Sequence, residues 1–305
     1  MIRVHRCEDL PRCEVLWNSL WPRKGLFDLW PVRDCFFRRF SRPLLFLTAE
    51  EGLRPVGFLP LCRLEEQGRH VFFPGETWRE QTWLEQNRIP ASSPAGRDAL
   101  LEGLPGPLSL RYLTPRSLPP NRVREDETGY LFHPRRYGYS FDAYWRSFSG
   151  RSRKHLEEEL RRLETRGTCL RHDDPEDLDR LVELNLRTFG EDSYFRDPRF
   201  LGAFLDLAAW LRRRGLARLT SLRVGGRVAA VDLGGLFRGT LTVLAGGTDP
   251  EFPGVAKGMN LHHLRRACEE RLREVDFLCG DFGWKERLHL TPRPLFRLDR
   301  EPGDP

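Results

Sequence analysis

One segment in the second half of the sequence combines the features of an anion-binding site. Residues 240–264, TLTVLAGGTDPEFPGVAKGMNLHHL, are typical of a strand, a loop rich in glycine and proline, and the start of a helix that carries Lys257. The first N–H groups of a helix have no partner within the helix, and the helix dipole makes this end positive. The junction therefore suits a phosphate or a carboxylate, although the same residues also serve simply to form a turn.

A second candidate is a group of cations at the start of another expected helix, over residues 151–166. Arg151, Arg153 and Lys154 lie where the helix dipole disfavours positive charge unless an anion is also present. Two interpretations stay open for this group. The three side chains are either solvated surface charge or a binding site for a phosphorylated donor or acceptor.

Two further groups carry carboxylates. Asp232 interrupts the apolar strand run AAVDLGG, where a buried carboxylate is costly unless it has a partner. It is expected either to make structural hydrogen bonds or to act as a general base. The segment VDFLCGDFGWKERL places Asp276, Asp281, Trp284 and Lys285 around a glycine-containing bend at the end of a strand. Such a bend projects polar groups towards a cleft, although Lys285 is also compatible with a surface position or a salt bridge to Asp281.

Length and composition limit the possible classes of protein. The chain has 305 residues, of which 39% are hydrophobic and 31% are charged, so it can bury a sizeable core and is expected to form two domains. No run approaches the ~20 apolar residues of a membrane span, and the start MIRVHRCEDL lacks the apolar core of a signal peptide. We therefore expect a cytoplasmic protein.

The charged and sulfur-containing residues argue against two kinds of site. The net charge is +6, but arginine is dispersed along the whole chain, which does not indicate a dedicated nucleic-acid surface. The 50 basic residues include only four lysines, and lysine is expected where a compact ammonium matters. The seven cysteines are scattered and form no CxxC pair, so free thiols and no metal site are expected.

Hydrophobic patterns divide the chain into two halves with the same order of elements. Each half is predicted to contain helix or helices, a hairpin, a third strand, a helix and a strand, so that LFLTAEEGLRPVGFLPL aligns with LTSLRVGGRVAAVDLGG. Residues 114–129, TPRSLPPNRVREDETG, are the predicted linker. The predicted helices begin at Asp9, 94, 151, Asp174-Pro175, Asp197-Pro198 and near Lys257, and the predicted strands begin near Ile2, Leu44, Val56, His70, Leu108, Leu219, Arg227, Thr240 and Val275.

Three stretches of the second half resemble a known enzyme family. They are residues 141–164, FDAYWRSFSGRSRKHLEEELRRLE, residues 246–267, GGTDPEFPGVAKGMNLHHLRRA, and residues 275–288, VDFLCGDFGWKERL. Together with the element order they resemble the GNAT acyltransferases, more closely the CelD-like acetyltransferases of cellulose and exopolysaccharide loci, and through them the FemAB aminoacyltransferases. In the first half, VFFPGETWREQTW is similar to the family more loosely.

The resemblance implies a fold, a reaction and a set of site residues. The fold is a tandem GNAT-like (FemAB-like) α/β fold with mixed sheets flanked by helices, divided into residues 1–130 and an acyltransferase half, 131–305. The reaction is acyl transfer, most simply from acetyl-CoA, to an amine or hydroxyl of a sugar-linked or cell-envelope precursor held between the halves. Backbone N–H groups near Leu244 and Ala245 would polarise the thioester, and Lys285 would stabilise the oxyanion. Asp281 or Asp232 would be the base, Arg151, Arg153, Lys154 and Trp284 would bind the acceptor, and the donor pyrophosphate would lie on Gly254, Val255, Lys257, Gly258, Met259 and Asn260.

Two alternatives differ from this reading. The loop PGVAKGM stands where GNAT enzymes usually have Arg or Gln, two residues, Gly, one residue, and Gly or Ala. A Fem-like transferase that takes its acyl group from aminoacyl-tRNA is therefore the second enzyme hypothesis, although no heptad run predicts the coiled-coil arm of many such enzymes. The third hypothesis is a catalytically silent binding module of polysaccharide assembly.

Overall fold

The computed structural model describes residues 1–75, 83–104, 106–115, 123–280 and 283–301. The chain divides into two compact units. Unit 1 contains Met1–Gly129, Gly202–Leu207 and Arg293–Pro305, and unit 2 contains Tyr130–Leu201 and Ala208–Pro292. The two units are described separately below.

Unit 1 is built on a mixed sheet with the strand order β1-β2-β3-β4-β5-β12. All neighbouring pairs are antiparallel except β4 and β5, which are parallel. Its elements are β1 (Ile2–Cys7), α1 (Leu10–Leu20), η1 (Leu26–Asp28), α2 (Trp30–Phe40), β2 (Leu44–Glu51), β3 (Arg54–Leu64), η2 (Glu65–Gln67), β4 (Arg69–Phe72), α3 (Pro94–Glu102), β5 (Leu108–Leu113) and most of β12 (Thr291–Arg300).

Local sequence signals explain the first elements of unit 1. The side chain of Asp9 accepts a hydrogen bond from the backbone N–H of Arg12 at 3.1 Å and so caps α1, as its residue type predicts. Strands β2 and β3 form the predicted hairpin. The sheet and helices enclose an aromatic core in which Trp30 stacks on Phe73 with ring centroids 4.8 Å apart.

The strands of unit 2 pair in the order β6-β11-β10-β9-β8-β7. Among its described strands, β10 and β11 pair in parallel and the other neighbours are antiparallel. Its elements are the end of β6 (Arg124–Phe132), η4 (Pro134–Tyr137), α4 (Phe141–Arg146), α5 (Gly150–Glu164), β7 (Thr168–His172), α6 (Asp177–Phe189), η5 (Gly190–Asp192), η6 (Tyr194–Arg196), α7 (Pro198–Arg213, of which Gly202–Leu207 belong to unit 1), β8 (Ala217–Val224), β9 (Arg227–Phe237), β10 (Thr240–Thr248), α8 (Val255–Glu269), β11 (Glu274–Asp276) and α9 (Trp284–Arg287).

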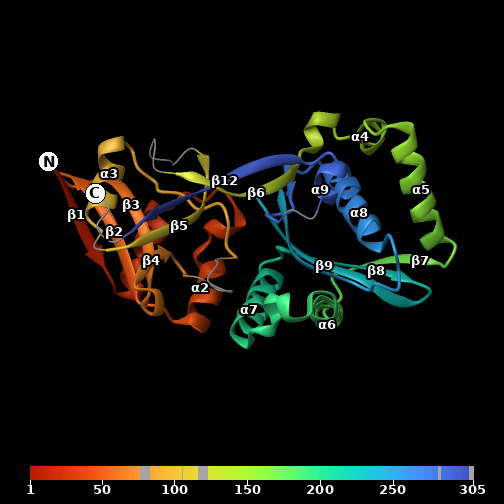
Figure 1. Cartoon of the computed structure of the whole chain (residues 1–305), viewed down its shortest axis with the longest axis horizontal. Coiled ribbons are helices and arrows are strands. Elements are labelled where there is room, and N and C mark those ends of the chain that lie inside the picture. Colours follow the sequence, from red (N-terminus) through yellow and green to blue (C-terminus); the bar gives the residue numbers. More distant parts are fainter. Residues whose placement is uncertain (76–82, 105, 116–122, 281–282, 302–305) are drawn as a thin grey trace. The chain divides into compact units, whose positions relative to one another are not determined.

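The sheet of unit 2 separates two helical layers, with α6 on one side of strands β8 and β9 and α8 on the other (Figure 1). The turn between β8 and β9 contains Gly225 and Gly226, whose φ angles of 57° and 78° favour glycine. Asp197 caps α7 by accepting from the backbone N–H of Arg199 at 2.8 Å. These two features confirm the predicted hairpin and helix start.

The predicted fold class is confirmed, because the strands of both units pair in a mixed manner and are flanked by helices. Among the described residues, six of the α-helices and strands were not predicted: α2, α4, α9, β6, β7 and β12. The prediction of a loop over residues 114–129 is wrong at its end, since β6 begins at Arg124. Residues 116–122 of that stretch, and residues 76–82 of the motif VFFPGETWREQTW, lie outside the described part of the chain.

Candidate active site

Strands β10 and β11 pair side by side over a short distance and then part. Their parallel pairing joins Thr240–Thr242 to Glu274–Asp276, after which β11 ends while β10 continues to Thr248. Directly beyond the last pair, the register of β10 with β9 shifts between Val243 and Ala245, which leaves Leu244 opposite no residue of β9. A bulge of this kind redirects the backbone locally. The backbone of Leu244 and Ala245 therefore lies where the two parallel strands separate.

The next two residues of β10 are glycines that contact opposite layers of unit 2. A Cβ on Gly246 would lie 2.3 Å from Asp232 Oδ1, and a Cβ on Gly247 would lie 2.7 Å from the backbone oxygen of Leu181 in α6. Both separations are shorter than a side chain tolerates, so both positions require glycine. The alternation places Asp232 on the α8 side of the sheet, because successive residues of a strand face opposite sides.

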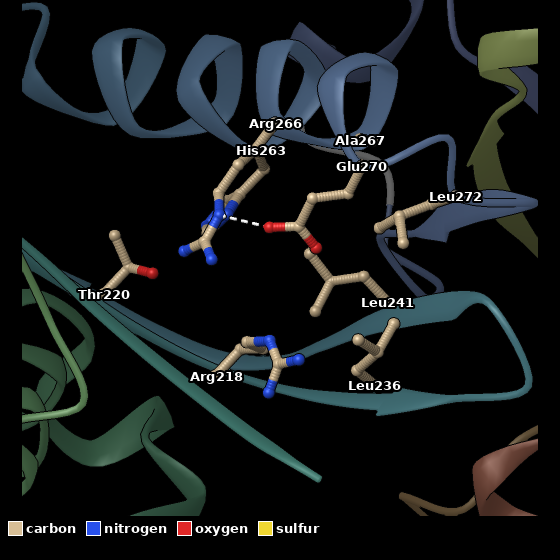
Figure 2. Close-up of a pocket in the computed structure, with 9 residues that line it drawn as sticks. All are labelled: Arg218, Thr220, Leu236, Leu241, His263, Arg266, Ala267, Glu270 and Leu272. Atoms are coloured by element: carbon tan, nitrogen blue, oxygen red, sulfur yellow. Dashed lines mark hydrogen bonds and ion pairs between the residues drawn. The ribbon is translucent and has the colours of Figure 1, made fainter. Parts of the chain in front are cut away.

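Asp232 has a partner that the sequence analysis did not identify. His263 Nε2 of α8 donates to Asp232 Oδ2 at 2.9 Å, and both side chains are buried. Figure 2 shows His263 among the side chains around a small pocket between α8 and the sheet, of about 20 Å³. This volume holds roughly one water molecule. The adjacent histidines of LHHL were the available signal, but only the fold brings the second one to Asp232.

The neighbouring His262 is held uncharged by its surroundings. Burial, together with the cationic side chains and the histidines close by, lowers the pKa of His262 to about 4. Its ring stacks on that of His172 in β7, with centroids 5.3 Å apart. Burial likewise lowers the pKa of His172. The α8 side of the sheet therefore contains imidazoles that stay neutral near pH 7.

Helix α8 begins as the sequence predicts, but its first turn is partly covered. Gly254 precedes the helix with a φ of 88°, and the backbone N–H groups of Ala256 and Lys257 donate to no acceptor in the described ranges. Lys257 Nζ donates to both carboxylate oxygens of Glu159 in α5, at 2.7 and 2.5 Å. A Cβ on Gly254 would lie 3.6 Å from Glu159 Cβ. Helix α5 thus places a carboxylate beside the expected anion site.

The remaining residues of the expected donor site differ in exposure. Val255 and Met259 are buried in a hydrophobic cluster with Phe252. Gly258 and Asn260 are half-buried. Val255 and Met259 can therefore contribute backbone atoms to a ligand, while their side chains build the core.

Lys285 is buried inside unit 2, which rules out the surface position considered above. The residue is 2% exposed. Its ammonium donates to the backbone oxygens of Phe277 at 3.0 Å, Leu278 at 2.9 Å and Cys279 at 2.8 Å. It also lies 5.3 Å from the ring centroid of Tyr130. These three acceptors belong to the segment that directly follows β11, so Lys285 shapes the chain where β11 leaves β10.

The other predicted site residues lie in three places. Trp284 is half-buried and packs edge-on against Phe277 with centroids 5.4 Å apart, Asp276 is buried at the end of β11, and Asp281 lies outside the described residues. Arg151 and Lys154 are exposed on the first turns of α5, and Arg153 is half-buried. For these three cations the described part of the chain offers no ion-pair partner, so they remain available to an anion.

Comparisons with known proteins agree with this arrangement. Residues 150–286 match the family model of the acetyltransferase (GNAT) domain. A search of curated protein sequences gave no match. The match covers the region from the start of α5 to α9, which includes the parted strands, the first turn of α8 and Lys285.

Solved structures share the fold over nearly the whole chain. A conserved protein of unknown function from Bacteroides thetaiotaomicron VPI-5482 has a TM-score of 0.61 at 11% identity, covering 97% of this chain and 99% of that one. FemX has a TM-score of 0.61 at 12% identity, with 97% and 96% covered. L-PGS from Bacillus licheniformis has a TM-score of 0.56 at 9% identity, with 96% and 92% covered. At these identities the likeness concerns the fold.

These findings define the class of the protein. Unit 2 contains a GNAT-type acetyltransferase domain, which identifies the protein as an acyltransferase, and the chain shares its fold with FemX. Within the described ranges, no three His, Cys, Asp or Glu side chains are arranged to hold a metal ion. None of the helices among the described residues combines the length and apolar character that crossing a membrane requires.

Proposed function

We propose that the chain transfers an acetyl group from acetyl-CoA to an amine or hydroxyl of a sugar-linked or cell-envelope precursor, in the manner of CelD-like enzymes of exopolysaccharide synthesis. The observation that carries this proposal is the bulge at Leu244, which lies where β10 parts from β11. In this proposal the backbone N–H groups of Leu244 and Ala245 would polarise a thioester carbonyl there. The loop of residues 249–254 connects the same strand to the first turn of α8.

The donor site follows from this placement. The N–H groups of Ala256 and Lys257 are available to the pyrophosphate of CoA, and the residues from Gly254 to Asn260 would form its cradle. The pantetheine arm would then enter the space between β10 and β11, with its carbonyl at the bulge. The proposed acetyl-CoA is a co-substrate, and the reaction requires no metal.

The chemical step is a nucleophilic acyl substitution. The acceptor nitrogen or oxygen attacks the carbonyl carbon, a tetrahedral intermediate forms, and the carbon–sulfur bond breaks to release CoA as a thiolate that takes up a proton. Asp232 or Asp281, directly or through water, would accept the proton from the acceptor. Lys285 would stabilise the oxyanion by its charge. To donate a hydrogen bond to the oxyanion directly, its ammonium would have to give up its hydrogen bond to one of the three backbone oxygens.

The residues that have no role in donor binding or in the chemical step support a sugar-linked acceptor that carries phosphate. Arg151, Arg153 and Lys154 suit the phosphates of a nucleotide-linked or lipid-linked sugar, because no carboxylate in the described ranges neutralises them. The half-buried ring of Trp284 is suited to stack on a sugar. We assign the reaction to residues 131–305 and treat residues 1–130 as the other GNAT-like half.

One observation favours a second candidate, a transferase that uses aminoacyl-tRNA. Glu159 already occupies the neighbourhood of the α8 N-terminus and pairs with Lys257, where a CoA pyrophosphate would need a positive site. A donor that does not place a pyrophosphate on this turn avoids the carboxylate. The third candidate is a binding module without activity. Such a module has no need of a buried lysine at this place, so Lys285 argues against it.

Calorimetric titration with acetyl-CoA, and then with CoA, tests the donor. We expect both to bind, and Ala256→Asp to weaken binding about tenfold, since Ala256 is exposed in the first turn and a carboxylate there repels phosphate. Ala256→Asn is the matched neutral control and should bind as the wild type does. Absence of binding by both ligands would exclude the CoA-dependent proposal and direct the test to aminoacyl-tRNA.

A further inference from the structure

We propose that a groove of unit 2, which shares only Gly258 with the proposed donor site, binds an amphiphile with a hydrocarbon body and a cationic amine head. The groove has a volume of about 530 Å³ and lies between α4, α5, β7, β8 and α8. This size is within the range of small-molecule sites. We refer to it as the α5 groove, and it is independent of the donor that the enzyme uses.

The walls of the α5 groove are predominantly apolar. Leu160 and Leu163 of α5, Leu222 of β8 and Leu261 of α8 line it. At one end, the rings of Phe141 and Trp145 stack with centroids 6.0 Å apart and an interplanar angle of 20°. Leu170 of the edge strand β7 lines the groove and is 39% exposed. An apolar body in the groove would cover the exposed surface of Leu170 and of the half-buried side chains Leu160, Phe141 and Trp145.

The charges around the α5 groove are mainly negative. Asp142, Glu157 and Glu164 line it, and none of the three has an ion-pair partner in the part of the chain that the structure describes. Arg265 is the cation that lines it, and its guanidinium lies over the ring of Phe141 at 4.1 Å. Glu157 accepts a hydrogen bond from Trp145 Nε1 at 3.2 Å. An amine head therefore finds carboxylates beside an apolar wall, whereas a fatty acid or a phosphate meets repulsion.

Most of the α5 groove lies away from the donor site, with which its lining shares only Gly258. A Cβ on Gly258 would point towards Leu222 at 3.3 Å and Leu160 at 3.5 Å, so the groove lies on the side of α8 that faces β7 and β8. The parted strands β10 and β11 lie towards the other edge of the same sheet. The acidic lining is also unsuited to the phosphates of CoA. The groove is thus an accessory site for a cationic amphiphile.

Fluorescence of Trp145 tests the proposal on the full chain. Dodecylamine, dodecanol and dodecanoate are titrated below their micelle-forming concentrations, and the signal of a Trp145→Phe variant is subtracted to isolate Trp145 from the other tryptophans. We expect saturable binding with dodecylamine tightest, dodecanol weaker and dodecanoate weakest. Equal binding of the three probes, or no saturable signal, would overturn the proposal.

Matched variants connect the preference to named residues. The double variant Glu157→Gln/Glu164→Gln should weaken dodecylamine binding about tenfold and leave dodecanol binding unchanged, because it removes charge and keeps shape. Glu158→Gln, on the same helix but outside the lining, is the control and should bind as the wild type does. Leu170→Arg, at an exposed position, should weaken all three probes. If the double variant retains the amine preference, the carboxylates do not recognise the head and the proposal fails.

Discussion

Each unit contains a buried cation that is held by carbonyl oxygens, yet the two cations are held differently. Arg33 of α2 donates to the backbone oxygens of Phe27 at 2.7 Å and Phe73 at 2.5 Å, and to Asn87 Oδ1 at 2.6 Å. Lys285 of α9 donates to the backbone oxygens of three successive residues, 277–279. Arg33 thus joins segments that are far apart in the sequence, whereas Lys285 encloses a single stretch.

The difference follows from the shapes of the two side chains. The planar guanidinium presents donors in a fixed fork and stacks on aromatic rings, and Arg33 lies 5.1 Å from the ring centroid of Trp17. The ammonium is a compact point charge whose donors diverge around one centre. Burial lowers the pKa of Arg33 to about 9, which still leaves it charged near pH 7. Arg33 therefore stabilises the core of unit 1, whereas Lys285 shapes the backbone at the proposed site.

The largest expected effect on stability is that of Arg33→Met. The substitution removes the donors of three buried carbonyl groups and should lower the free energy of unfolding of unit 1 by about 3 to 5 kcal/mol. Denaturant unfolding, monitored by tryptophan fluorescence, measures the change. Arg38→Met on the same helix is the control, and it should cost ~0 to 1 kcal/mol because Arg38 is exposed. If Arg33→Met lowered the free energy of unfolding by less than 1 kcal/mol, Arg33 would not hold the distant segments of unit 1 together.

Lys285→Ala should affect turnover more than donor binding. If Lys285 stabilises the oxyanion, turnover falls by roughly 10² to 10³ while the affinity for acetyl-CoA stays almost intact. Lys285→Arg should recover activity only in part, because a planar guanidinium cannot enclose three successive oxygens as the ammonium does. Steady-state kinetics with any identified acceptor measure these effects.

Two controls separate chemistry from folding in this prediction. Thermal melts of the Lys285 variants show whether unit 2 is still folded. Arg287→Ala, an exposed position on the same short helix, should leave turnover nearly unchanged. Near-wild-type turnover of Lys285→Ala would reduce Lys285 to a structural residue comparable with Arg33.

A third buried charged group, the carboxylate of Asp232, is paired with the imidazole of His263 and not with carbonyl groups. The substitution Gly246→Ala tests the packing around it. The added methyl would lie 2.3 Å from Asp232 Oδ1, so we expect a loss of about 1 to 3 kcal/mol in the free energy of unfolding. In an Asp232→Ala background the same methyl should cost little more, since the opposing carboxylate is gone. Additive losses in a double-mutant cycle would show that the carboxylate does not limit this position.

The smallest expected effect is a weak response to acid in both units. Burial lowers the pKa of His70 in unit 1 and lowers that of His262 in unit 2 to about 4. The unfolded chain therefore binds more protons than the folded chain below about pH 6.5, so stability is complete above that pH and is lost as the pH falls towards 4. Urea unfolding between pH 7 and 4 should show a shallower pH slope for His262→Asn than for the wild type. An equal slope would assign the acid response to other groups.

The missed elements show where local patterns carry too little information. Strand β7 is exposed at nearly every residue, so TCLRH has no apolar alternation to mark it as a strand. Strand β12, TPRPLFRLDR, contains two prolines, which usually argue against a strand. The sheet edges and the pairing partners of these segments, more than their own residues, determine that they are strands.

The sequence alone determined the order of most elements, the two hairpins and the junction of strand, loop and helix at residues 240–264, because turn residues, caps and hydrophobic periods are local properties. It also indicated the acyltransferase class through motifs within single segments. The tertiary structure decided which charges meet: Glu159 with Lys257, His263 with Asp232, and Lys285 with the chain beyond β11. The first two contacts join segments that are far apart in the sequence, and their formation depends on how whole helices pack on a sheet, which no local pattern specifies. Lys285 contacts a stretch six to eight residues before it, and the packing of unit 2 decides that its ammonium is buried there.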